Sequence, residues 1–147
     1  MTSVEASSSW ALAGGAQPPR LPEGIDLPRD RMLVMGILNV TPDSFSDGGR
    51  FLDPGAALDH AQEMLDEGAD LVDLGGESTR PNSTRISEDE EWERIGSIIQ
   101  RLAASGVVVS VDTLHALTAR RAADAGAAII NDVSGGRWDP QMNAAVA

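Results

Sequence analysis

The segment MGILNVTPDSFSDGG, residues 35–49, changes character at Asn39. Up to Asn39 the chain is continuously apolar from Met32 onward, as is typical of a β-strand that is buried on both faces. After Asn39 the segment is mostly polar and rich in glycine. A buried strand that ends in such a loop predicts a βα unit whose loop holds functional groups.

The same strand–loop–helix pattern repeats along the chain. It predicts strands at residues 32–39, 69–76, 107–112 and 127–135, and helices at 54–68, 87–106, 115–126 and from 139 onward. Asp53 with Pro54 predicts the start of the first helix, and Ser87 with Glu90 predicts a capping box at the start of the second. Asp139 is the predicted cap of the last helix.

Four consecutive units of this kind require parallel strands joined by right-handed crossovers. They can form a doubly wound open sheet or half of a (β/α)8 barrel. Each predicted strand finishes in polar residues, which in a barrel converge on one mouth. The G-x-G-x-x-G motif typical of a nucleotide-binding open sheet does not follow the first strand. We therefore predict an α/β fold, the first half of a (β/α)8 TIM barrel with about four parallel βα units.

A complete (β/α)8 domain has about 250 residues. The predicted last helix is still running where the 147-residue sequence stops, so we expect the chain to be a truncated form or a piece of a longer protein. Residues 1–31 are rich in Ser, Ala, Gly and Pro and lack periodicity, which predicts a disordered leader. Residues 32–147 are predicted to form the half barrel.

The composition argues against several classes of protein. With 11 arginines, no lysine and 23 acidic residues the net charge is −12, so general nucleic-acid binding is not expected. The lack of cysteine excludes disulfides and thiolate metal sites. No apolar run approaches about 18 residues and no signal peptide is recognisable, so we expect no membrane span and a cytoplasmic location.

The first two loops contain groups that suit anions and metal ions. Asn39 can place its amide oxygen at the barrel mouth as a neutral ligand, and Asp47 could hold that amide or share a divalent ion. In the second loop, GGESTRP, Thr79 and Arg80 combine a hydroxyl with a guanidinium, which suits a carboxylate or a phosphate. The alternatives are ordinary turn residues and a solvated surface arginine.

The last two predicted strands end in residues that can recognise a heterocycle. Asp112 ends an apolar strand, where a carboxylate is costly unless a donor or a cation satisfies it. Capping of the next helix is its alternative role. Asn131 offers a donor and an acceptor. Asp132 competes with Asn131, because alternation along a strand sends one of the two outward.

Other polar residues are expected to lie outside the site. His60 and His115 are placed in helical segments, away from the strand ends, as surface or packing residues. The acidic run at 88–91 suits a helix N-terminus and is given no further role. Trp92 is predicted on the core face of its helix.

Four motifs together resemble the signatures of the dihydropteroate synthase family, in its order and at its spacing. They are MGILNVTPDSFSDGGRF (35–51), GADLVDLGGESTRP (68–81), VSVDT (109–113) and INDVSGG (130–136). The resemblance implies a TIM-barrel transferase of folate biosynthesis. Members join 6-hydroxymethyl-7,8-dihydropterin diphosphate to p-aminobenzoate, forming 7,8-dihydropteroate and diphosphate. It also implies a possible homodimer for the full-length protein.

The resemblance assigns roles to individual residues. Asn39 would contact the Mg²⁺ held by the diphosphate, and Asp47 would order the first loop. Asp47 and Arg80 are the implied catalytic residues. The implied substrate-binding residues are Thr79, Arg80, Pro81, Asp112 and Asn131.

Two departures from the family pattern leave alternatives open. The chain has TRPNS at 79–83 where the family commonly continues TRPGA. The family also takes an Asp, a Lys and an Arg–His pair from later strands, which lie beyond this sequence. The alternatives are a catalytically silent pterin-binding paralogue and the pterin-binding domain of a corrinoid-dependent methyltransferase.

Overall fold

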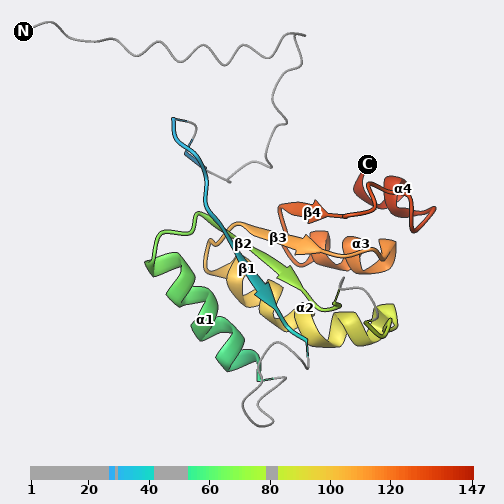
Figure 1. The fold of residues 1–147 in the computed structure, drawn as a ribbon, viewed down its shortest axis with the longest axis horizontal. Helices are drawn as coiled ribbons and strands as arrows, with labels where there is room; N and C mark the ends of the chain where they lie inside the picture. Colours follow the sequence, from blue (N-terminus) through green and yellow to red (C-terminus); the bar gives the residue numbers. More distant parts are fainter. Residues whose placement is uncertain (1–26, 29, 42–52, 79–82) are drawn as a thin grey trace, which may run out of the picture.

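The structure is a computed structural model that describes residues 27–28, 30–41, 53–78 and 83–147 (Figure 1). Strands and helices alternate along it: β1 (Met35–Asn39), α1 (Pro54–Asp66), β2 (Leu71–Gly75), α2 (Glu88–Ala104), β3 (Val109–Asp112), α3 (Ala116–Asp124), β4 (Ile129–Asn131) and α4 (Met142–Val146). The predicted leader falls almost wholly outside the described residues. Asp47, Thr79, Arg80 and Pro81 also lie outside them, and their roles remain predictions.

All four strands are parallel and pair in the order β1-β2-β3-β4. A doubly wound sheet reverses its strand order at a switch point and has helices on both faces. Here the order follows the sequence, and α1, α2 and α3 contribute to a single apolar core on one face. The predicted fold of four successive βα units of a (β/α)8 barrel is confirmed.

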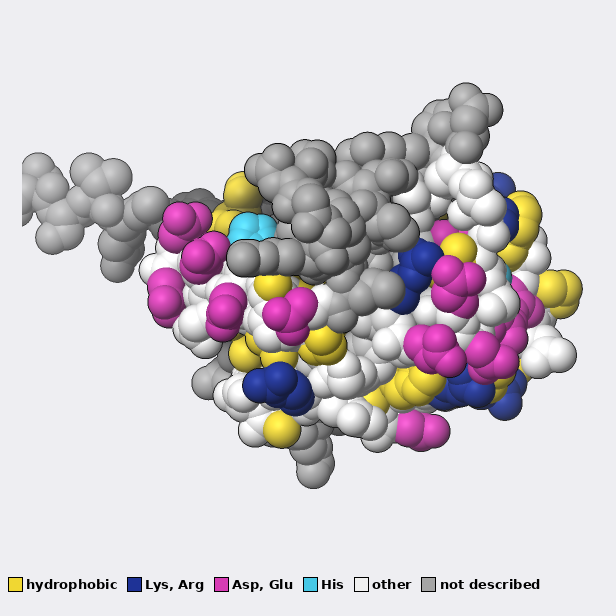
Figure 2. All heavy atoms as spheres, turned by 90° about the horizontal axis from the view of Figure 1, so that it is seen from below, with side chains coloured by type: hydrophobic (Ala, Val, Ile, Leu, Met, Phe, Trp, Pro, Cys, Tyr) yellow, Lys and Arg dark blue, Asp and Glu magenta, His cyan; other side chains and the backbone are white. Residues whose placement is uncertain are grey.

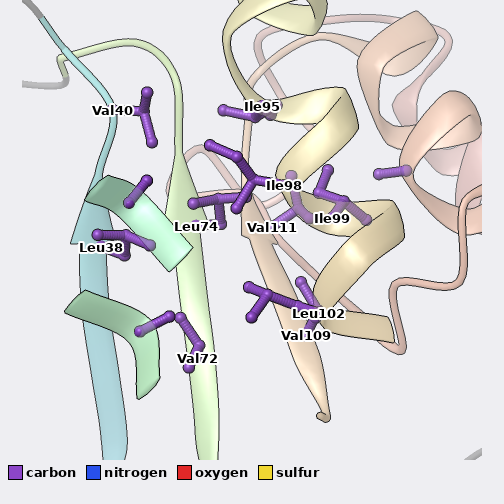
Figure 3. Packing of buried hydrophobic residues seen from close by; sticks show 13 residues of the cluster. Leu38, Val40, Val72, Leu74, Ile95, Ile98, Ile99, Leu102, Val109 and Val111 are labelled. Atoms are coloured by element: carbon purple, nitrogen blue, oxygen red, sulfur yellow. The ribbon is translucent and has the colours of Figure 1, made fainter. Parts of the chain in front are cut away.

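The apolar core lies between the sheet and its helices (Figure 3). Alternate residues of the strands point toward the helices, because successive side chains of a strand lie on opposite faces. The core residues are Leu38, Val40, Val72, Leu74, Val109 and Val111 from the strand segments, with Ala57, Ala61, Ile95, Ile98, Ile99, Leu102 and Ala122 from the helices. Trp92 is partly buried against this core, as predicted.

The predicted helix starts are confirmed for α1 and α2. Asp53 accepts a hydrogen bond from Gly55 N, and the Ser87 side chain accepts one from Glu90 N. The reciprocal half of the predicted capping box is not formed, because the Glu90 carboxylate pairs with Arg94 one turn later at 2.5 Å.

The last predicted unit differs from the structure. The strand is limited to Ile129–Asn131, and α4 begins at Met142 with Gln141 as its N-cap. The prediction that Asp139 caps α4 is wrong. Its carboxylate instead accepts hydrogen bonds from Gln141 N, in a turn before α4, and from Ala116 N in the first turn of α3. Asp139 therefore connects the end of the chain to the start of α3.

Acidic side chains are common on the surface. Figure 2 shows one face of the molecule, on which they gather toward the left and the right of the view, with arginines among them. This distribution agrees with the net charge of −12. In the part of the chain that the structure describes, no helix is long and apolar enough to cross a membrane.

Candidate functional site

The polar ends of the four strands lie in one row across the sheet. Asn39 pairs in register with Gly75, Gly75 with Asp112, and Asp112 with Asn131. Residues in register on neighbouring strands point to the same face, which here is the face opposite the helices. The sequence prediction that Asn39, Asp112 and Asn131 share one opening is therefore supported by the register.

Gly75 leaves a gap in this row. A Cβ atom added there would lie 3.2 Å from Asn39 Oδ1 and 3.7 Å from Asp112 Cβ. The amide oxygen of Asn39 thus lies close to Gly75, in the space that a side chain there would occupy. A ligand can approach the backbone closely at this point, because glycine has no side chain.

The Asp112 carboxylate has an environment that disfavours its charge. Burial raises its pKa to about 6, with further contributions from the negative charges of Asp73, Glu91, Asp132 and Glu77. Its Oδ1 is buried and has no hydrogen-bond partner among the described residues. The alternative that Asp112 caps α3 is not supported. At the start of α3, His115 N donates to Thr113 Oγ1 and Ala116 N donates to Asp139 Oδ2.

A second polar row lies on the same face, two residues closer to the N-terminal ends of the strands. Asp73 pairs in register with Ser110, and both precede the first row by two residues. Asp73 is 4% exposed, and its Oδ2 accepts a hydrogen bond from Asn131 Nδ2 at 3.1 Å. Asp73 Oδ1 and Ser110 Oγ are buried without a partner in the described structure. With Asp112 Oδ1, three unsatisfied polar atoms gather on one face, as expected where a ligand binds.

Of the two candidates at the end of β4, Asn131 lies in the polar row and Asp132 does not. Asp132 follows β4 and accepts hydrogen bonds from Ser134 N at 2.7 Å and Gly136 N at 2.8 Å. Burial acts to raise the pKa of Asp132, but these hydrogen bonds outweigh it and the pKa is lowered. Asp132 is therefore a turn residue, whereas Asn131 belongs to the row.

A charged cluster connects the loops that follow β2, β3 and β4. Glu77 is buried; its carboxylate lies 2.7 Å from Arg85 Nη1 and 3.1 Å from His115 Nε2. The Arg85 guanidinium stacks over the Trp138 ring at 4.8 Å. The prediction that His115 lies away from the strand ends is wrong, because α3 begins only at Ala116 and His115 is its N-cap. His60 is exposed on α1, as predicted.

Glu91 corrects the interpretation of the acidic run at 88–91. It is 1% exposed, and its carboxylate accepts a hydrogen bond from Thr113 Oγ1 at 2.8 Å. Burial raises its pKa. Side-chain periodicity alone could have indicated this position, since Glu91 lies one helical turn before the buried Ile95. The position of Asp73 could also have been noticed from the sequence, because it is a charged residue in the middle of an apolar strand.

The described residues contain no cluster of three or more His, Cys, Asp or Glu side chains that could hold a metal ion. A single oxygen ligand is nevertheless available in Asn39. Mg²⁺ usually keeps several waters and is bound through one or two protein oxygens together with substrate phosphates. The donor set therefore fits a metal that arrives with a phosphorylated ligand.

Comparison with known proteins identifies the family. The family model "Pterin binding enzyme" matches residues 35–147, which is most of the chain and includes both polar rows. The chain belongs to this family. The curated dihydropteroate synthase of Bacillus subtilis is 54% identical over 115 residues, covering 78% of this chain and 40% of the relative.

Solved structures of the pterin binding enzymes agree with this assignment. A Xanthomonas albilineans dihydropteroate synthase with 4-aminobenzoic acid has a TM-score of 0.75 and 49% identity, over 82% of this chain and 45% of that one. The same enzyme in complex with 7,8-dihydropteroate has a TM-score of 0.73 and 45% identity, over 87% and 47% of the two chains. The chain thus spans less than half the length of these relatives.

Proposed function

We propose that this chain provides the pterin-binding part of a dihydropteroate synthase. The reaction condenses 6-hydroxymethyl-7,8-dihydropterin diphosphate with p-aminobenzoate, giving 7,8-dihydropteroate and diphosphate. The observation that carries the proposal is the in-register row Asn39–Gly75–Asp112–Asn131 with its unsatisfied carboxylate oxygen. A cytoplasmic location and a homodimer of the full-length protein remain predictions.

The row suits recognition of a pterin ring. The ring edge carries N–H donors, and the free oxygen of Asp112 needs a donor. Asn131 supplies an amide that can accept from, and donate to, the same ring. The flat ring can pass close to the backbone at Gly75, where a side chain would meet Asn39 and Asp112.

The reaction itself needs charge stabilisation and orientation. The arylamine nitrogen forms a bond to the exocyclic methylene carbon, while the carbon–oxygen bond breaks and diphosphate leaves with the electron pair. The nitrogen then loses a proton. Positive charge that develops on the pterin is stabilised by a fixed carboxylate such as Asp112. No covalent enzyme nucleophile is required.

Magnesium fits this proposal through Asn39. Its amide oxygen is directed over Gly75 into the row, where it could provide one ligand. When bound, the ion would neutralise charge on the departing diphosphate. Asp47, Thr79 and Arg80 are proposed to complete the anion-binding side from the first two loops.

Pterin binding and turnover test the proposal separately. We expect the 147-residue chain to bind the dihydropterin diphosphate, and Asp112→Ala to weaken this binding. Asp124→Ala, on the exposed end of α3, is the matched control and should bind normally. A chain that does not bind pterin, or an Asp112→Ala variant with parental affinity, would refute the assignment.

Turnover is measured on a chimera of this chain with the part of the Bacillus subtilis relative that lies outside the matched segment. We expect diphosphate release that depends on both p-aminobenzoate and magnesium. Pterin binding without release by the chimera would contradict the synthase and favour the silent paralogue. The TRPNS sequence at 79–83 is the feature that makes this second outcome worth testing.

A further inference from the structure

We propose that Asp73 is a positioning residue that holds the Asn131 side-chain amide in one orientation, with its oxygen free to accept a hydrogen bond from the ligand. This inference rests on the proposed function, since the orientation of Asn131 matters most if a heterocycle binds there. Asp73 itself has no part in the roles assigned above.

The first support is the place of Asp73 in the sheet. It lies in the middle of β2, on the same face as the polar row and two residues before Gly75. It is 4% exposed, although a buried carboxylate is costly unless it is hydrogen-bonded. Among the described residues no arginine or histidine pairs with it. Because burying this carboxylate costs free energy, we expect Asp73 to have a role beyond packing.

The second support is the hydrogen bond that Asp73 makes within the described part of the chain. Asn131 Nδ2 donates to Asp73 Oδ2 at 3.1 Å, between residues 58 positions apart in sequence. A carboxylate only accepts hydrogen bonds, so it selects the nitrogen of an amide and rejects the oxygen. Nitrogen and oxygen leave the amide carbon in different directions. Fixing Nδ2 on Asp73 therefore turns Asn131 Oδ1 away from Asp73.

The consequence is a defined pattern of acceptors in the row. Asn131 Oδ1 and the free oxygen of Asp112 are both left to accept hydrogen bonds. Without Asp73, the amide could rotate by about 180° and present its NH2 group instead, since the two orientations have nearly the same shape. A ligand whose edge offers two hydrogen-bond donors would then find only one acceptor in the row. Asp73 also contributes, after burial, to the raised pKa of Asp112.

A double-mutant cycle tests whether Asp73 acts through Asn131. The affinity of the 147-residue chain for 6-hydroxymethyl-7,8-dihydropterin diphosphate is measured for Asp73→Ala, Asn131→Ala and the double variant. We expect Asp73→Ala to lose about tenfold, the value of one hydrogen bond to a charged group. The double variant should bind no more weakly than Asn131→Ala. Losses that multiply in the double variant would overturn the inference.

Two further variants control for folding. Asp73→Asn keeps the size of the side chain, but its amide can pair with Asn131 in either orientation, so affinity should still fall severalfold. Asp70→Ala removes an aspartate that lies just before the same strand and away from the row. The Asp70 carboxylate accepts hydrogen bonds from Arg31 and from Val34 N. Asp70→Ala is expected to lower stability and to leave affinity unchanged. Parental affinity in Asp73→Asn would count against the positioning role.

A readout without ligand separates this inference from the proposed function. The Asn131 side-chain NH2 signals are observed by ¹⁵N NMR and assigned by their loss in Asn131→Ala. They should shift and exchange faster with water in Asp73→Ala, whether or not pterin binds. Unchanged signals would overturn the inference while leaving the function intact. A parent chain that binds no pterin but shows the shift would refute the function and support the inference.

Discussion

Replacing Asp112 with Asn is expected to stabilise the folded chain at neutral pH while weakening pterin binding. The reason is the pKa of this carboxyl, which burial and neighbouring negative charges raise from its ordinary value of 3.8 to about 6. At about 1.4 kcal/mol per pKa unit, the difference corresponds to about 3 kcal/mol. Because the side chain is only partly buried, solvent screening lowers this value, and we expect about 1–2 kcal/mol.

The dependence on pH has a definite sign. The carboxyl releases its proton near pH 3.8 in the unfolded chain and near pH 6 in the folded chain. Between these values the folded state binds more protons, so this group makes folding less favourable as the pH rises. The penalty is absent below the lower value and complete above the higher one. The gain in unfolding free energy from Asp112→Asn should therefore grow as the pH rises from 3.8 to about 6, and stay constant at higher pH.

Urea unfolding of the parent and of Asp112→Asn at pH 4 to 8 measures this difference directly. Subtracting the parent's unfolding free energy from that of the variant at each pH removes the contribution of every group that titrates alike in both proteins. Asp132→Asn provides the contrast, because the pKa of Asp132 is lowered from its ordinary value of 3.8 and its contribution to stability is lost only as the pH falls below that value. Its difference curve should therefore be flat between pH 4 and 8, whereas the curve for Asp112→Asn should rise with pH up to about 6. A flat curve for Asp112→Asn, or a gain that grows toward acid pH, would refute the reasoning.

Substitutions at three other positions test the packing around the row. Gly75→Ala places a methyl group 3.2 Å from Asn39 Oδ1, so we expect at least severalfold weaker pterin binding with a cooperative unfolding transition retained; unchanged affinity would contradict the close approach. Glu91→Ala leaves the hydroxyl of Thr113 without its buried acceptor and should cost about 2 kcal/mol in urea unfolding, whereas Glu91→Gln keeps an acceptor and should cost less at pH 7. Ile98→Ala opens a cavity in the core and should cost about 3 kcal/mol, with pterin affinity per folded molecule unchanged.

Most of the fold could be predicted from the sequence because each unit has strong local signals. Asp53 and Ser87 mark helix starts through hydrogen bonds to residues two or three positions away, and such contacts are visible in the sequence itself. The last unit was predicted less well. Asp139 has the sequence signature of a cap, but it bonds Ala116 across 23 positions, and no local pattern reports a contact of that kind.

The site was predictable where it depends on strand ends and not where it depends on burial between elements. Asn39, Asp112 and Asn131 each follow an apolar run, and parallel pairing brings such ends together. For Asp73 and Glu91 the sequence signals burial of a charged residue, but it does not show which partners make that burial tolerable, because those partners are tertiary. Asp73 bonds a residue two strands away, and Glu91 bonds the loop after β3.

The alternation of side chains along the strands determines the fold and the site together. Leu38, Leu74 and Val111 share one register row and pack against the helices, while the next residue on each strand belongs to the polar row. A shift of one residue would exchange the two faces, exposing the apolar row and burying the polar side chains of Asn39 and Asp112 without partners. The free energy that fixes the register is therefore the burial of the apolar row. That same burial holds the unsatisfied Asp112 carboxylate at its strand end, although this group disfavours folding until a ligand provides its donor.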